Sequence, residues 1–187
     1  MSILNNFECL SIALTNGWWF SLIFISINGF MIAIYPEHFK LRVLKQPEFE
    51  NKYQRVCTII SFLLFQFSIW YSIFIPVIFD TISFYSGLLL YITGLICYIT
   101  AMVNYASTSP DQPVTKGIYR FSRNPQQIMS ILIWVGVGLM LQSYLIVICS
   151  LLQIPFSYPG FIAQEKTCIK KYGQPYIKYL KESRRYL

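Results

Sequence analysis

Four long stretches without a charged residue constrain this chain more than any other feature. They cover residues 9–36, 56–79, 81–110 and 124–164. A helix needs about 20 apolar residues to cross the hydrocarbon core of a bilayer, and each of the first three stretches is long enough for one crossing. As a single helix the fourth would be roughly 60 Å long, about twice the thickness of that core. The fourth stretch must therefore fold back on itself.

Composition agrees with a membrane protein. The chain is 55% hydrophobic and 12% charged, against about a quarter charged in an average soluble domain. The same values exclude a disordered chain, which needs low hydrophobicity and dense charge. We predict an all-α polytopic fold in one membrane domain, residues 1–187, with a C-terminal helical hairpin that turns at Gln142 and Ser143. The five predicted transmembrane helices are 10–35, 56–79, 82–105, 126–141 and 144–161, followed by a C-terminal cytoplasmic segment, 162–187.

The basic residues provide an independent test of this span count. All 15 Lys and Arg residues lie between spans one and two, between spans three and four, or after span five. Because short loops rich in Lys and Arg stay cytoplasmic, we predict an outside N-terminus and a cytoplasmic C-terminus. The net charge of +7 then reflects topology and attraction to anionic lipid headgroups, not nucleic-acid binding. The loop 36–55 is interpreted as an interfacial connector.

Metal chemistry has little support in the sequence. His38 is the only histidine, and the five cysteines are scattered without a closely spaced pair. Zinc sites and disulfide frameworks both need closer spacing. We therefore expect no metal site.

Glycine and proline residues mark special positions inside the predicted spans. Gly87 and Gly94 share one helix face, which favours close helix packing over contact with a ligand. Pro155 and Pro159-Gly160 indicate that the fifth span is kinked or broken near the cytoplasmic face. Irregular backbone at that depth has to line protein or a water-filled cavity, so we expect a pocket there.

The segment before the fourth span is dense in polar groups. Gly117 indicates a turn, and Asn124-Pro125 indicates a helix start with proline in the first turn. The first N–H groups of such a helix attract a carboxylate or phosphate, and Arg120 and Arg123 lie beside them. Alternatively, these arginines anchor the helix to anionic lipid headgroups.

The segment after the fifth span begins with an unusual acid. Glu165 is expected at the cytoplasmic end of a membrane helix, where the helix dipole disfavours negative charge, so it needs a partner. That partner is either a cationic ligand or a local lysine, Lys166 or Lys170. Tyrosines follow at helical spacing and form either an interfacial aromatic face or an adenine-sized slot; they are Tyr172, Tyr176 and Tyr179.

Taken together, these two segments carry an ordered set of residues. The set reads Gly117-Ile118-Tyr119, Arg123-Asn124-Pro125, the Gln142-Ser143 turn, Glu165, Cys168, Tyr172-Gly173, Tyr176, Tyr179 and Arg185-Tyr186. In order and spacing, the last 75 to 80 residues or so resemble the integral-membrane methyltransferases that include isoprenylcysteine carboxyl methyltransferase and the phospholipid N-methyltransferases.

The resemblance implies an S-adenosylmethionine-dependent methyltransferase with a cytoplasmic cofactor pocket and a lipophilic acceptor that enters from the bilayer. It implies catalytic roles for Arg123 and Glu165. Glu165 or tyrosine faces would suit the sulfonium of the cofactor, and Arg123 with the helix start would suit its carboxylate. The implied cofactor-binding residues are Gly117, Tyr119, Arg123, Asn124, Pro125, Gln164, Glu165, Tyr172 and Tyr176.

Departures from the family pattern bear on the acceptor. The family has Tyr, Gly and Glu where this chain has Gln127, Met129 and Gln164, and the proline near the family's C-terminus is Arg184 here. An amine acceptor must lose a proton before attack, whereas a carboxylate or thiolate needs no base. We therefore expect a carboxylate or thiolate acceptor, with a phospholipid or other lipid amine as the alternative. Two further alternatives are an NADPH-binding protein like the sterol reductases, and a non-catalytic protein of the same fold.

Overall fold

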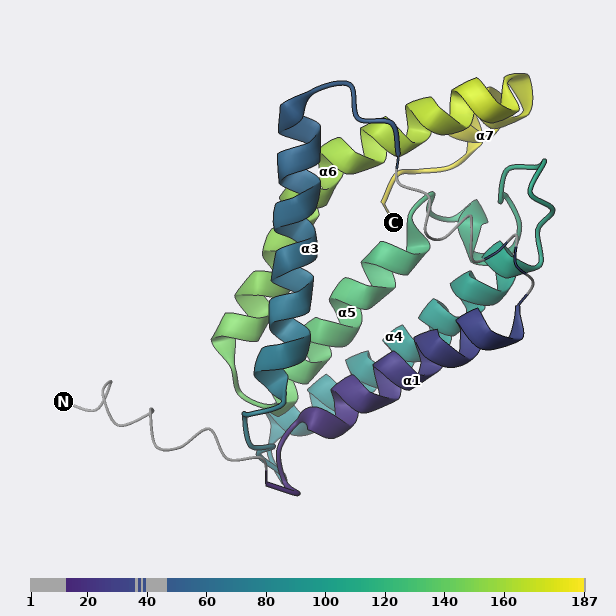
Figure 1. Ribbon diagram of the computed structural model, residues 1–187. Helices are drawn as coiled ribbons and strands as arrows, with labels where there is room; N and C mark the ends of the chain where they lie inside the picture. The colour runs from purple at the N-terminus through teal and green to yellow at the C-terminus, as the bar shows by residue number, and fades with distance from the viewer. Residues whose placement is uncertain (1–12, 36, 38, 40–46, 187) are drawn as a thin grey trace.

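The computed structural model of this protein describes residues 13–35, 37, 39 and 47–186, and it is all-α (Figure 1). This confirms that the fold is all-α, as predicted. The α-helices are α1 (Trp18–Ile34), α3 (Lys52–Ser72), α4 (Ile82–Ala106), α5 (Pro125–Met140), α6 (Tyr144–Tyr172) and α7 (Gln174–Glu182), with a short 3-10 helix, η2 (Gly117–Arg120).

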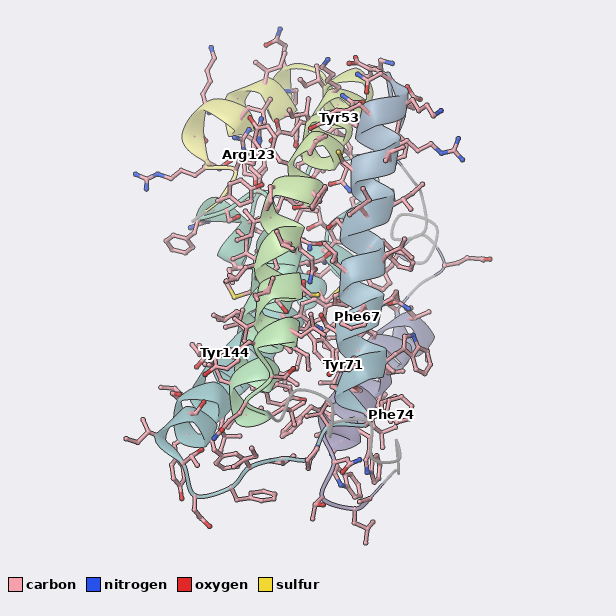
Figure 2. All side chains as sticks on the ribbon, turned by 90° about the vertical axis from the view of Figure 1, so that its left-hand side faces the viewer. Tyr53, Phe67, Tyr71, Phe74, Arg123 and Tyr144 are labelled. Carbon is pink, nitrogen blue, oxygen red and sulfur yellow. The ribbon has the colours of Figure 1, made fainter. Side chains whose placement is uncertain are left out.

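The apolar helices make this an integral membrane protein. Within the described residues, α3, α4 and α6 are long and apolar enough to cross a bilayer, and α1 and α5 are shorter apolar helices. Large apolar side chains such as Phe62, Leu89 and Ile148 are exposed on these helices, as expected for surfaces that face lipid. Exposed tyrosines lie near both ends of the bundle: Figure 2 shows Tyr53 near one end and Tyr144 near the other. Tyrosine is typical of the two membrane interfaces.

Glycines bring α4 and α5 into close contact. A Cβ atom added to Gly87 would lie 2.5 Å from the Gly136 carbonyl oxygen, and one added to Gly136 would lie 2.6 Å from the Gly87 oxygen. An added Cβ at Gly94 would lie 2.8 Å from Ile133. The packing role predicted for Gly87 and Gly94 is therefore confirmed.

A second pair, α3 and α6, packs side by side, and Trp134 of α5 fills the centre of the bundle. The ring of Trp134 meets Phe24 of α1 at 5.9 Å and Phe65 of α3 at 6.2 Å between centroids. Both contacts are edge-to-face, the geometry that aromatic pairs prefer. Through this tryptophan, α1, α3 and α5 share one core.

The hairpin turns where the sequence predicts it. Between α5 and α6, Gln142 has a φ of 49°, and the Ser143 side chain accepts a hydrogen bond from the Ile146 N–H at 3.5 Å. The Ser143 N–H also donates to the Gly138 carbonyl oxygen at 2.8 Å. These bonds satisfy backbone groups that the two helix ends leave free.

Helix α6 extends beyond residue 161, the predicted end of the fifth span. Helix α6 continues from Tyr144 to Tyr172, with Pro155 and Pro159 inside it, so the segment after residue 161 begins as helix. Each proline removes one helical N–H donor but keeps a helical φ, which bends a helix that neighbouring packing holds together. Figure 1 shows α6 changing direction along its length. The helix is bent but not broken.

Boundaries of other spans also differ. Helix α3 begins at Lys52, ahead of the predicted residue 56, because the Asn51 side chain caps it by accepting from the Gln54 N–H at 2.9 Å. It ends at Ser72 instead of residue 79. The chain after it pairs with the segment before α1: the Gly17 N–H donates to the Ile75 oxygen at 2.9 Å. Helix α1 begins at Trp18, and the first residues of its predicted span, 10–12, lie outside the described residues.

The two ends of the bundle differ in charge. One end holds the α5–α6 turn and the connection between α3 and α4 (Figure 1). The opposite end holds the start of α3, the segment between α4 and α5, the last turns of α6, and α7 with the C-terminal residues. Every Lys and Arg that the structure describes lies in that second group of segments.

Candidate active site

A three-residue charge cluster lies at the basic end of the bundle. Glu165 of α6 accepts hydrogen bonds from Arg185, with Nε to Oε1 at 2.9 Å and the terminal nitrogen to Oε2 at 2.7 Å. A terminal nitrogen of Arg123 lies 3.2 Å from the same Oε1. The side chains are only 11% exposed at Glu165 and 14% at Arg123, so solvent screens the cluster weakly. Its net charge is +1.

Backbone pairing sets the position of this cluster. The Arg123 N–H donates to the Arg184 carbonyl oxygen at 2.8 Å, which ties the segment before α5 to the C-terminal residues. The Ser122 hydroxyl and the Asn124 side-chain amide both donate to the Arg185 carbonyl oxygen, at 3.2 and 3.3 Å. These bonds hold Arg123 and Arg185 on opposite sides of the Glu165 carboxylate. Asn124 therefore joins two chain segments and does not cap α5 with its side chain.

The partners of Glu165 answer a question that the sequence leaves open. Its neighbours Lys166 and Lys170 pair with Glu50 and Glu48 instead. The alternative in which a local lysine is the partner of Glu165 is therefore wrong. Its protein partners are the two arginines.

Arg123 keeps one unused donor in this cluster. Its Nε is buried and has no hydrogen-bond partner among the described residues. A buried donor without a partner is costly, which favours a bound acceptor at this position. Arg185, by contrast, uses its Nε and one terminal nitrogen on Glu165. Its guanidinium lies over the Tyr158 ring at 4.9 Å from the centroid, and the hydrogen bonds that Arg185 donates to Glu165 raise its pKa.

The predicted tyrosines form a packed layer near this cluster. The Tyr179 hydroxyl donates to the Tyr119 carbonyl oxygen at 2.7 Å, and the Tyr172 hydroxyl donates to the Pro110 oxygen at 3.2 Å. Tyr176 lies between Tyr172 and Tyr179, with ring centroids at 6.4 and 5.7 Å. Burial raises the pKa of Tyr176, and it raises that of Tyr179 to about 12, so both hydroxyls stay protonated at neutral pH. They can donate hydrogen bonds but cannot act as bases.

The backbone conformation of Gly117 favours glycine at this position. Its φ is 59°, and an added Cβ would lie 2.1 Å from the Asn104 side-chain nitrogen. The turn it makes lets η2 pack on the end of α4, where Tyr119 is buried beside Ala101 and Val114. The predicted turn at Gly117 is thus confirmed. Both Gly117 and Tyr119 pack against α4.

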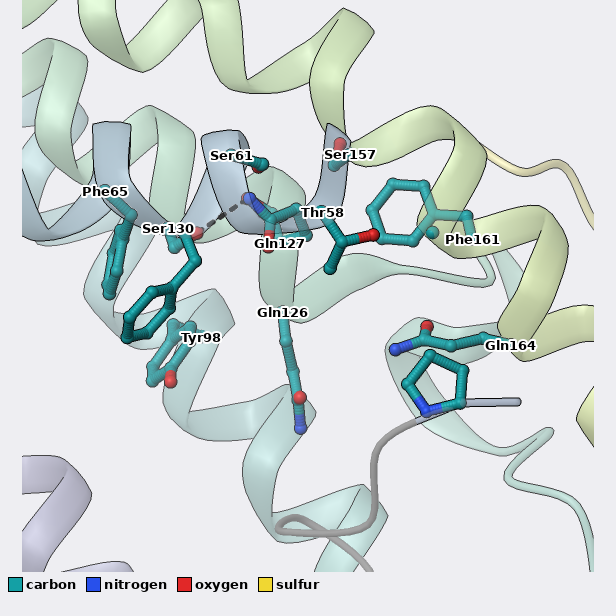
Figure 3. Close-up of a pocket in the computed structure, with 13 residues that line it drawn as sticks. Thr58, Ser61, Phe65, Tyr98, Gln126, Gln127, Ser130, Ser157, Phe161 and Gln164 are labelled. Carbon is teal, nitrogen blue, oxygen red and sulfur yellow. Dashed lines mark hydrogen bonds between the residues drawn. The ribbon is translucent and has the colours of Figure 1, made fainter. Parts of the chain in front are cut away.

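A cavity of about 330 Å³ opens among α3, α4, α5 and α6. Figure 3 shows Phe65 and Tyr98 on one side of it and Phe161 on the other, with Thr58 and Gln127 between them. All polar side chains in the described lining are uncharged: Thr58, Ser61, Tyr98, Gln126, Gln127, Ser130, Ser157 and Gln164. An uncharged polar wall among aromatic rings suits a small organic molecule.

The cavity and the charge cluster are neighbours. Gln164 lines the cavity and precedes Glu165 in α6, and the cavity-lining ring of Phe161 meets Tyr186 edge-on at 6.0 Å. Of the predicted cofactor-binding residues, Arg123, Asn124 and Glu165 meet in the cluster, and Gln164 lies in the cavity wall. Pro125 is buried at the start of α5, behind Asn124.

Sequence reasoning missed several residues of this site. Arg185 was recognised only as part of a motif, without a role, because it lies 20 residues after Glu165 and meets it only through the fold of the C-terminal residues. Gln127 was noted as a departure; in the structure its side-chain nitrogen donates to the fully buried Gln153 oxygen at 3.2 Å. Ser157 and Thr58 gave no signal, because a lone hydroxyl in a membrane helix often bonds its own backbone.

Comparison with known families decides the chemistry of this site. Residues 82–174 match the model of the phospholipid methyltransferase family, which groups with the isoprenylcysteine-type membrane methyltransferases. The chain belongs to this family. The matched residues run from the start of α4 to the start of α7 and include Arg123, the hairpin and Glu165. No curated protein matches the chain.

This membership makes the protein an S-adenosylmethionine-dependent methyltransferase with a lipid methyl acceptor. The residues fit that cofactor. The unpartnered Nε of Arg123 and the positive charge of the cluster suit its carboxylate, and the aromatic and amide wall of the adjoining cavity suits its uncharged parts. The NADPH-binding and non-catalytic alternatives are therefore set aside.

Proposed function

We propose that this enzyme methylates the head of a lipophilic acceptor that reaches the cavity among α3, α5 and α6 from the bilayer. The observation that carries the proposal is the position of the cavity beside the Arg123–Glu165–Arg185 cluster. The cluster supplies charge at the basic end, and the cavity, which Gln164 lines next to Glu165, lies among membrane helices. A site that spans both environments suits a polar cofactor and an apolar substrate.

We propose distinct roles for the charged residues. Bound S-adenosylmethionine supplies an electrophilic methyl group on a sulfonium cation. Arg123 binds its carboxylate through donors that Glu165 leaves free. Glu165 fixes the orientation of both guanidinium groups and offsets part of their positive charge. Asn124 and Pro125 position Arg123 at the start of α5.

The remaining proposed contacts are supporting ones. Gln164 lies in the cavity wall, within reach of either substrate as an uncharged donor and acceptor. The tyrosine layer, with Gly117 beneath it, closes the basic end and excludes water. Excluding water and aligning donor with acceptor are the main requirements of methyl transfer, since no covalent intermediate with the protein is needed.

The acceptor follows from what the cavity lacks. No carboxylate lies in its described lining, and both oxygens of Glu165 already accept from arginine. An amine acceptor would need a base, whereas a carboxylate or thiolate is already nucleophilic. We therefore propose a lipid carboxylate or thiolate as the acceptor. The second candidate is a phospholipid amine, which the description of the matched family favours.

The membrane arrangement is also proposed. Helices α1, α3, α4, α5 and α6 each cross once, within one membrane domain, with the N-terminus outside and the C-terminus cytoplasmic. The gathering of the described basic residues at one end of the bundle supports this orientation. Lysines at that end would also contact anionic headgroups in the cell membrane.

A binding and transfer experiment tests the function. Detergent-purified protein should bind S-adenosylmethionine saturably in calorimetry and should not bind NADPH. With methyl-labelled cofactor, an S-farnesylcysteine derivative with a free carboxylate should become labelled, and phosphatidylethanolamine should not. A methyl ester releases volatile methanol in base, whereas an N-methyl group does not, so the two products are told apart. Labelling of phosphatidylethanolamine alone would establish the second candidate.

Lysines of α7 provide a test of where the site ends. Lys178 and Lys181 are exposed and lie on α7, away from the cluster. Replacing either with alanine should change methyl transfer by less than about twofold, because an isolated exposed charge contributes little. A tenfold loss in turnover for Lys181→Ala would place α7 inside the binding site and contradict this assignment.

A further inference from the structure

The cavity is bordered at the basic end by a short segment from the other half of the chain. Residues 47–50 precede α3, and Pro47 is one of the residues that line the cavity. Figure 1 shows this segment crossing to α6 at the end of the bundle. The segment therefore forms part of the cavity wall without belonging to any of its helices.

Three polar contacts hold this segment against α6. The Glu48 carboxylate lies 2.9 Å from the Lys170 ammonium, and the Glu50 carboxylate lies 2.5 Å from that of Lys166. The Glu48 N–H donates to the Thr167 hydroxyl at 3.2 Å. All three partners lie within two turns of α6, shortly after the cavity-lining Gln164. These contacts attach residues 47–50 to α6, which forms one wall of the cavity.

These ion pairs are exposed, which makes the closure weak. Lys170 and Glu48 are 71% and 65% exposed, and Lys166 and Glu50 are 48% and 50% exposed. The Glu48 contact raises the pKa of Lys170, which shows attraction but no burial. Exposed pairs change an equilibrium by a factor of at most about five each, and salt screens them. Such contacts can hold a segment closed and still release it readily.

We propose that residues 47–50 form a gate over the cavity, held shut by the Glu48–Lys170 and Glu50–Lys166 ion pairs. When the pairs separate, the segment lifts from α6 and the cavity opens at the basic end. That the cavity receives substrate rests on the proposed function, but the gate itself does not. Separation leaves Lys166 and Lys170 free for other anions, which makes opening sensitive to ionic strength.

Access to the cavity can be measured directly with a thiol probe. Ser157 lines the cavity and is buried, and Ser157→Cys keeps its shape. The rate of alkylation by iodoacetamide is read at position 157 by peptide mass spectrometry, so the native cysteines can stay. Ser86→Cys, at an exposed position far from the gate, corrects for intrinsic thiol reactivity.

Charge reversal then tests whether the Glu48–Lys170 ion pair holds the gate shut. In the Ser157→Cys protein, Glu48→Lys should raise the alkylation rate severalfold, because it places two cations together. Adding Lys170→Glu restores the opposite charges and should bring the rate back. Raising salt from about 0.05 to about 0.5 M should speed alkylation with the native pair and have little effect in Glu48→Lys.

Equal rates in all variants, or no recovery in the charge swap, would overturn the gate. The measurement needs neither cofactor nor acceptor, so it remains informative if methyl transfer fails. Conversely, loss of cofactor binding with a working gate would contradict the proposed function alone.

Discussion

Replacing Glu165 with glutamine should lower the affinity for S-adenosylmethionine by about 100-fold or more. The amide keeps the shape of the side chain but removes the charge that holds Arg123 and Arg185. Without that charge the guanidinium of Arg123 loses the partner that fixes its orientation toward the carboxylate of the cofactor, and a 100-fold loss of affinity corresponds to about 2.8 kcal/mol of binding free energy. Calorimetric titration of purified protein measures this change.

The control must separate cofactor binding from folding. Glu182→Gln removes an exposed carboxylate that lies 3.9 Å from Lys178, and it should leave affinity unchanged. Titration below the thermal midpoint of each variant ensures that folded protein is compared. Unchanged affinity in Glu165→Gln, with normal folding, would remove Glu165 from the binding site.

Leucine in place of Gly87 should separate α4 from α5 and destabilise the whole bundle. The added side chain would meet the Gly136 carbonyl oxygen, a backbone atom that cannot rotate away. Overpacking a tight contact costs about 1–3 kcal/mol, which corresponds to a fall in thermal midpoint of about 2–12 °C for a chain of this length. Thermal unfolding in detergent measures the shift.

Gly29 provides the matched control. It lies on α1, also inside an apolar helix, and an added Cβ there would meet nothing within 4 Å. Gly29→Leu should therefore keep or slightly raise the thermal midpoint, because leucine favours helix more than glycine does. Equal losses in the two variants would show that leucine itself, and not the α4–α5 contact, causes the effect.

Several local features were predictable because neighbours in sequence decide them. The turn at Gln142 and Ser143 lies at the most polar pair between two apolar runs, 128–141 and 144–156. Gly117 makes a turn because its backbone adopts a φ that other residues resist. The continuity of α6, by contrast, depends on tertiary packing. Its prolines break an isolated helix, but packing of α6 along α3 keeps the helix continuous through them.

The residues of the site also fall into two groups, those that the sequence indicated and those that only tertiary contacts brought together. Sequence order identified Arg123 and Glu165 as members of one motif, and the family match covers both. It did not show that Arg185 would share the carboxylate, because that contact depends on the C-terminal residues folding back onto the segment before α5. Nor did it show the hydroxyl and amide wall of the cavity, which comes from four separate helices.

By itself, the sequence determined that this protein is helical, lies in a membrane and carries a methyltransferase motif. Long uncharged stretches force backbone hydrogen bonds inside helices, and that requirement is independent of how the helices pack. Only the tertiary structure decided which charges meet, where the cavity opens and what borders it. Those features depend on contacts between residues far apart in the chain, such as Glu48 with Lys170 and Glu165 with Arg185, and a linear pattern does not specify them.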